Sequence, residues 1–308
     1  MMYQSVLIFV TLVVCALGST ELNAFLPANV SAEHRRLASE HFHRLASMVD
    51  VRTLKAVLGN NTNYKSKFPF PHMYVDNIFP QDILDAANKE IADDPKLIDG
   101  CAEGISKCYL NSKTELKKNA FEDDQRMGPA TAALFAFLKS SHFIKFLESL
   151  TGIADIIPDP HYFGSGIHQT LPGGFLQLHA DFNNYKRYDW HRRVNVFIYM
   201  NHDWKDEYGG HLELWHRDLK RCGAMIRPLL GRLAVFSTTD FSYHGHPNPL
   251  RTPPNRSRRS IAMYYYTTTR PSSECIWWNC RASHSTLWQT AACSSCNDKR
   301  CKSFKEIV

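Results

Sequence analysis

The chain has 308 residues, of which 44% are hydrophobic and 21% are charged, so it can bury a large core. This composition excludes a largely disordered protein, and the length allows one large domain or two small ones. The formal net charge is only +6, and no arginine-rich helix or aromatic-basic stretch is present, which argues against nucleic acid as a partner.

The first 18 residues resemble a secretory signal peptide. An apolar run from Ser5 ends in Ala16-Leu-Gly18, the small-x-small pattern of a cleavage site. The run is shorter than the roughly 20 residues that span a bilayer, and no later segment is long and apolar enough. We therefore predict a signal peptide over 1–18, a location in the secretory pathway (endoplasmic reticulum lumen or secreted), and no stable membrane span after cleavage. Because no Lys or Arg precedes the run, an uncleaved N-terminal membrane anchor is the alternative.

Residues 19–64 are expected to be a helical or partly disordered N-terminal segment. Ser31 can cap a helix that runs to about residue 49, whose apolar face would carry Leu37, Phe42, Leu45 and Met48. The three histidines of this helix are better explained by a solvated amphipathic helix than by a metal site.

A larger domain is predicted over 65–270. It opens with a strand from Pro69 and a helix with Pro80 near its first turn. A second helix is expected over 129–150, where apolar residues recur with a helical period and Gly152 can end the helix. We expect this helix to pack on the outside of the β core.

After Pro158 the sequence consists of short alternating or apolar runs separated by turns, which is typical of a barrel or jelly roll. The strands that we expect are Tyr162–Thr170, Phe175–Ala180, Val194–Met200, His211–Trp215, Ala224–Pro228, Leu233–Ser237 and Ser260–Thr267. The predicted fold is mostly β with flanking helices (α+β), with the β core at about 160–270.

A candidate metal site lies in this β core. His179 and Asp181 are two residues apart, so in an extended strand they point to the same side and can bind one ion. A third ligand is available in His244 or His246. Two histidines and one carboxylate form the ligand set of non-haem Fe(II) oxygenases.

The order of motifs around these ligands resembles the 2-oxoglutarate and Fe(II)-dependent dioxygenases, in particular the prolyl 4-hydroxylase type. The motifs are His179-x-Asp181, Arg193-Val-Asn-Val-Phe-Ile-Tyr199, Gly209-Gly-His-Leu-Glu-Leu-Trp215, Arg232–Ser237, His244 and Arg258-x-Ser260. The resemblance implies a double-stranded β-helix (a cupin-like jelly roll). It also implies His179, Asp181 and His244 as the catalytic metal ligands, with Fe(II), 2-oxoglutarate, O2 and L-ascorbate as cofactors.

The same resemblance assigns a group of residues to 2-oxoglutarate. Arg258 occupies the family's position for the cation that binds the far carboxylate of 2-oxoglutarate, and period-two alternation puts Ser260 on its face while Arg259 points away. Tyr199 matches a tyrosine that also reaches this carboxylate. Asn195 shares the face of Tyr199, and we include it among the cofactor-binding residues.

Residues 271–308 form a cysteine-rich C-terminal tail. Eight of the nine cysteines remain after signal removal, and an even number behind a signal peptide predicts disulfides. Cys101 and Cys108 are close enough in the chain to pair. The tail spacing, Cys275-x4-Cys280-x12-Cys293-x2-Cys296, would also suit zinc, and Cys293 and Cys296 could form a redox pair, but structural disulfides are favoured.

We therefore expect an enzyme that hydroxylates a residue in a peptide or protein of the secretory pathway, with succinate and CO2 as co-products, and proline is the residue that we favour. Hydroxylation of a free amino acid or another small molecule is one alternative. A catalytically inactive secreted binding protein on the same scaffold is another. The sequence does not indicate an oligomeric state.

Overall fold

The computed structural model describes Leu26 and residues 29–93, 107–109, 113–290 and 296. The predicted signal peptide and Cys101 lie outside these residues. Within the described part of the chain, no helix combines the length and the apolar character needed to cross a membrane.

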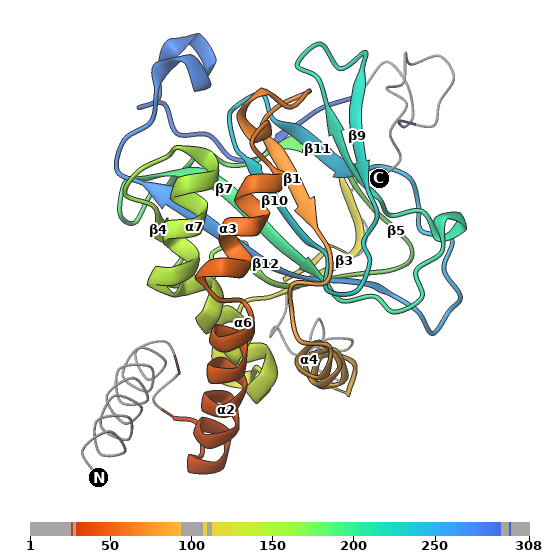
Figure 1. Cartoon of the computed structure of the whole chain (residues 1–308). Helices are drawn as coiled ribbons and strands as arrows, with labels where there is room; N and C mark the ends of the chain where they lie inside the picture. Colours follow the sequence, from red (N-terminus) through yellow and green to blue (C-terminus); the bar gives the residue numbers. More distant parts are fainter. Residues whose placement is uncertain (1–25, 27–28, 94–106, 110–112, 291–295, 297–308) are drawn as a thin grey trace, which may run out of the picture.

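The helices lie together on one side of the molecule (Figure 1). They are α2 (Ala32–Met48), α3 (Val51–Asn60), α4 (Gln81–Asp93), α6 (Pro129–Lys139) and α7 (Ser141–Thr151). Short 3-10 helices are η1 (Tyr64–Ser66), η2 (Asp124–Arg126), η3 (Asp206–Tyr208), η4 (Ser272–Glu274) and η5 (Ile276–Trp278).

The helix ends follow ordinary capping chemistry. The Ser31 hydroxyl accepts a hydrogen bond from the His34 amide, and Gly152 ends α7 with a positive φ of 72°, as the sequence predicts. Glu90 of α4 caps α6 from a distance, because its carboxylate accepts the amides of Ala130 and Thr131 at 2.8 Å. The expectation that Met48 faces the core is wrong, since its side chain is 50% exposed.

The strands described form one 13-stranded, antiparallel sheet that curls into a barrel-like jelly roll, which confirms the predicted fold class. The order along its main path is β1-β10-β7-β12-β5-β11-β8-β9. The strands are β1 (His72–Val75), β2 (Lys107–Tyr109), β3 (Glu115–Phe121), β4 (Ile157–Pro158), β5 (Gly166–Ala180), β6 (Asn184–Tyr185), β7 (Trp190–Tyr199), β8 (Leu212–Trp215), β9 (Cys222–Ile226), β10 (Leu233–Ser237), β11 (Tyr243–His246), β12 (Arg258–Thr267) and β13 (Leu287–Trp288).

Strand β5 links the two halves of the jelly roll. Its first part pairs with β12, its last part pairs with β11 and β13, and β3 pairs with both parts. It replaces the two shorter strands that we expected. Between the two parts lie Gly173, with φ of 77°, and Gly174, where a Cβ would meet the Leu116 carbonyl oxygen at 2.6 Å. A side chain at Gly174 would therefore force β3 away from β5.

The two faces of the central strands have different roles. On β7 and β12, Val194, Val196, Ile198, Ile261, Met263 and Tyr265 belong to the core that also contains buried residues of α2, α6 and α7. The alternate residues point into the jelly roll. Strand periodicity therefore gives each strand one helix-facing side and one side that faces the interior.

The described part of the C-terminal tail belongs to this fold. Disulfides join Cys222 to Cys296 and Cys275 to Cys280, each with a Cα–Cα distance of 5.2 Å. Structural disulfides are thus confirmed at these positions. Because Cys296 is bonded to Cys222, the structure contradicts a Cys293–Cys296 redox pair and a zinc site that uses Cys296. Cys293 lies outside the described residues.

Candidate metal centre

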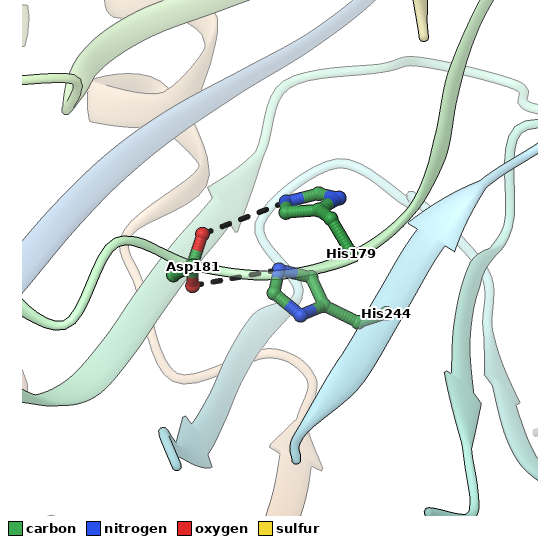
Figure 2. Close-up of side chains that lie close together, drawn as sticks. All are labelled: His179, Asp181 and His244. Atoms are coloured by element: carbon green, nitrogen blue, oxygen red, sulfur yellow. Dashed lines mark ion pairs between the residues drawn. The ribbon is translucent and has the colours of Figure 1, made fainter. Parts of the chain in front are cut away.

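Three of the predicted site residues converge at one point inside the jelly roll. His179 lies near the end of β5, Asp181 follows the strand directly, and His244 on β11 pairs with His179 across the sheet. Figure 2 shows both imidazoles turned toward the carboxylate of Asp181. The His179 Nε2 atom is 3.5 Å from Asp181 Oδ1, and the His244 Nε2 atom is 3.7 Å from Asp181 Oδ2. The ligand atoms of the three residues all lie within 4.8 Å of one another, so one ion can contact all three.

Backbone carbonyls fix the orientation of both imidazoles. The Nδ1 atom of His179 is 2.8 Å from the carbonyl oxygen of Gln177, and the Nδ1 atom of His244 is 2.9 Å from that of Ser242. A carbonyl can only accept, so each Nδ1 must carry the proton and donate it, which leaves the Nε2 lone pair free for a metal. Burial lowers the pKa of His244 to about 4 although Asp181 opposes this shift, so His244 is neutral at physiological pH.

The carboxylate of Asp181 is held by two buried side chains that come from β7. The Asn195 amide donates to Oδ2 at 2.8 Å, and the Arg192 guanidinium lies 3.0 Å from the same oxygen. Arg192 also donates from Nε to Asn195 Oδ1 at 2.9 Å, so the three side chains form one network. Burial alone would raise the pKa of Asp181, but Arg192 and then His244 hold it well below its usual range. Asp181 is therefore ionised and pre-oriented.

Arg192 was not among the residues that the sequence singled out. Simple alternation from Asn195 puts position 192 on the opposite, helix-facing side of the strand. The pairing of β7 with β12 has an irregularity between Tyr265 and Tyr266, where one residue of β7 is skipped, and this shift turns Arg192 inward. Its guanidinium lies 3.3 Å from the ring centroid of Tyr264, which shields the charge from water.

His179, Asp181 and His244 line a cavity of about 230 Å³ together with Arg258, Tyr199 and Ser260. Ser260 on β12 is directly paired with Tyr199 on β7. Arg258 is only 7% exposed, donates from Nε to the Gly210 carbonyl oxygen at 2.7 Å and lies 5.0 Å from the Tyr199 ring centroid. Burial lowers the pKa of Arg258. Among the described residues no carboxylate forms an ion pair with it, so this buried cation lacks an anion that the cavity can accommodate.

Three other side chains that the sequence analysis considered differ in their position relative to the cavity. Asn195 bonds to Asp181 and Arg192, so its contact with a cofactor stays a prediction. Arg259 points away from the cavity, where its guanidinium bonds to Ser257 and Asn88. His246 lines the cavity too, but it is not part of the group that can hold a metal ion.

The C-terminal tail contributes to the cavity, which sequence reasoning missed. Strand β13 pairs with the end of β5, so that Trp288 lies beside His179 with the ring centroids 5.0 Å apart. Thr286 also lines the cavity. A two-residue strand has no recognisable pattern, so the sequence offered no signal for this position.

The donor set fits a divalent iron ion and a small dicarboxylate. Two imidazoles that present Nε2 and an ionised carboxylate on one side of an ion match the facial arrangement of non-haem Fe(II) sites, in which other positions stay open. Arg258, Tyr199 and Ser260 offer a guanidinium and two hydroxyl groups to a carboxylate elsewhere in the same cavity.

A comparison with protein families agrees with this chemistry. Residues 165–266, about a third of the chain, match the family profile described as the 2OG-Fe(II) oxygenase superfamily. No curated protein matches the chain.

Several solved structures are similar in fold. One is a prolyl hydroxylase from Trichoplax adhaerens in complex with a peptide fragment of the hypoxia inducible factor oxygen degradation domain (15% identity, 70% of this chain and 91% of that chain, TM-score 0.49). Another is a prolyl-4-hydroxylase from Pseudomonas putida (17% identity, 70% and 99%, TM-score 0.45). A third comes from work on prolyl 4-hydroxylases of Phytophthora capsici (14% identity, 75% and 68%, TM-score 0.46).

Proposed function

We propose that this chain, a 2-oxoglutarate-dependent dioxygenase of the 2OG-Fe(II) oxygenase superfamily, hydroxylates a proline residue in a peptide or protein of the secretory pathway. The observation that carries the reaction class is the placement of the His179, Asp181 and His244 cluster and the buried Arg258 in one cavity. The cluster of three side chains suits the metal, and the buried guanidinium suits the dicarboxylate, so the cavity provides for both components that this chemistry needs.

Each of these residues has a definite task in the proposed reaction. His179, Asp181 and His244 would hold Fe(II). Arg258 would bind the far carboxylate of 2-oxoglutarate, with Tyr199 and Ser260 as further donors. When bound, iron and 2-oxoglutarate supply the oxidising chemistry, in which O2 is consumed, 2-oxoglutarate gives succinate and CO2, and the substrate gains a hydroxyl group.

The surrounding residues keep the ligands ready for this task. Arg192 and Asn195 keep the Asp181 carboxylate ionised and fixed in orientation. The carbonyls of Gln177 and Ser242 accept from Nδ1 of the two histidines and so turn their Nε2 atoms toward the metal position. The ring of Trp288 packs beside His179 and excludes water from that side. The site is therefore pre-organised, and metal binding needs little rearrangement.

The proposed substrate class and compartment are supported by features outside the metal site. The expected signal peptide and the two disulfides favour an oxidising compartment. The motif resemblance to prolyl 4-hydroxylases favours a proline residue within a peptide. L-ascorbate is included in the proposal as a reductant that would maintain Fe(II).

The test is succinate release by the full mature chain with Fe(II), 2-oxoglutarate and ascorbate, measured against proline-containing peptides and free amino acids. We expect stimulation by peptides and a mass increase of one oxygen on proline. Stimulation by free amino acids alone would contradict the peptide substrate. Absence of succinate with every substrate and without any substrate would contradict the reaction itself.

A further inference from the structure

A second cavity adjoins the metal cavity. It has a volume of about 500 Å³ and shares Phe163, Phe182 and Thr286 with the wall of the metal cavity. Its other walls come from the connection between β5 and β7 and from residues 284–286 of the tail. The two cavities therefore lie on either side of the same three side chains.

Three aromatic rings line the second cavity. The Phe163 ring stacks on the Tyr185 ring with centroids 5.1 Å apart and an angle of 7°, and it meets the Phe182 ring edge-on at 5.3 Å. Lys186 and Arg187 are exposed, and they lie at the rim. Such a surface suits an apolar, ring-shaped group, because flat aromatic faces pack well against the rings of proline-rich segments.

The tail wall of this cavity is firmly attached to the fold. Asn183 donates from its side-chain amide to the Ala282 carbonyl oxygen and accepts the His284 amide, both at 2.9 Å. The His284 imidazole lies 3.1 Å from the buried carboxylate of Asp240. Strand β13 and the Cys222–Cys296 disulfide hold the tail on the far side of this wall. The wall is thus a built part of the site.

We propose that the second cavity is a substrate subsite that binds a proline ring next to the hydroxylated residue of an extended peptide. The inference rests on the proposed function. The metal cavity is smaller than the roughly 300–1,000 Å³ of ordinary ligand pockets, so it accommodates the cosubstrate and the target side chain but no more of the peptide. In an extended peptide successive residues are about 3.3 Å apart and their side chains point in different directions, so the target residue can enter the metal cavity while its neighbour enters the adjoining one. The cysteine-rich tail is then a specificity element.

The probes are two dye-labelled peptides of the same length with a central proline, flanked either by prolines or by glycines. Binding is measured by fluorescence anisotropy without oxygen, with Fe(II) and 2-oxoglutarate present, so that no turnover occurs. We expect the proline-flanked peptide to bind the wild type about tenfold more tightly, as for a filled apolar pocket.

Two variants test the cavity. Ser285→Trp places a ring where the flanking proline would lie, and it should abolish the preference while leaving the glycine-flanked peptide unaffected. The matched control is Ser149→Trp, at an exposed position on α7, which should keep the full preference. Phe163→Leu removes one ring of the stack without filling the cavity and should reduce the preference, so the test remains informative if Ser285→Trp does not fold.

The outcomes separate the subsite from the proposed function. Hydroxylation of both peptides with an equal preference in wild type, Ser285→Trp and Phe163→Leu would overturn the subsite and leave the function intact. If neither peptide bound or stimulated succinate release while free amino acids did, both would be overturned.

Discussion

Removal of the charge of Arg258 should weaken the binding of 2-oxoglutarate, but it should not lower the stability of the protein without 2-oxoglutarate. Arg258→Met keeps most of the apolar stem but removes a guanidinium that is 7% exposed and that no carboxylate of the described residues neutralises. If the cation pairs with 2-oxoglutarate, its loss leaves a buried carboxylate unpaired, which costs about 3 to 5 kcal/mol. At about 1.4 kcal/mol for each factor of ten, the dissociation constant of 2-oxoglutarate should rise roughly a hundredfold to a few thousandfold.

The protein without 2-oxoglutarate should respond differently. Burial already disfavours the charge of Arg258, as its lowered pKa indicates, so its removal relieves an unpaired buried cation. The lost hydrogen bond to Gly210 offsets this gain by about 1 kcal/mol. We expect the melting temperature of Arg258→Met to be unchanged or higher than that of the wild type.

Anaerobic titration of the Fe(II)-loaded protein gives the affinity for 2-oxoglutarate, and differential scanning fluorimetry without 2-oxoglutarate gives the melting temperature. Arg259→Met is the matched control, because Arg259 is on the opposite face and bonds to Ser257 and Asn88. A lower melting temperature with an unchanged 2-oxoglutarate affinity in Arg258→Met would show that the residue is structural and refute this reasoning.

Three further variants probe the support of the site. Burial raises the pKa of Glu213 from 4.5, its value in the unfolded chain, to about 7 in the folded protein. Between these two pH values the folded state keeps a proton that the unfolded state has lost. The free energy of unfolding should therefore fall by up to about 3 kcal/mol as the pH rises from 4.5 to 7. Urea unfolding at several pH values should show this slope in the wild type and not in Glu213→Gln, and an equal slope in both would exclude Glu213 as its source. Cys222→Ser should lower stability by about 4 kcal/mol through release of a 74-residue loop, measured by the same unfolding, and unchanged stability would contradict the bond to Cys296. Arg192→Lys should weaken metal binding about 10- to 100-fold in a Mn(II) titration, because an ammonium cannot hold Asp181 and also donate to Asn195. Wild-type affinity would show that Asp181 needs no such support.

Local chemistry that can be recognised in the sequence predicts a large part of the fold. Gly152 ends α7 because only a residue that tolerates a positive φ fits there, and the alternation on β12 places Arg258 and Ser260 inward and Arg259 outward. These features depend on neighbouring residues alone. The resemblance of the motif order to the dioxygenases predicts that His179, Asp181 and His244 lie close together.

The missed features depend on contacts between distant segments. Strand β3 contains charged residues and does not alternate clearly, yet it forms because β5 supplies its hydrogen-bond partner. Arg192 is turned inward by a pairing irregularity with β12, which strand periodicity alone cannot locate. The position of Trp288 depends on β5 and on the Cys222–Cys296 disulfide. Tertiary contacts decide each of these cases.

The most direct test of the metal site is the visible metal-to-ligand charge-transfer band of the protein loaded with Fe(II) and 2-oxoglutarate in the absence of oxygen. The wild type should show the band, and His179→Ala and His244→Ala should abolish it. His246→Ala should retain it, because His246 lies in the cavity but outside the group that can hold a metal ion. A band that survives in both His179→Ala and His244→Ala, or that is lost in His246→Ala alone, would contradict the proposed ligands.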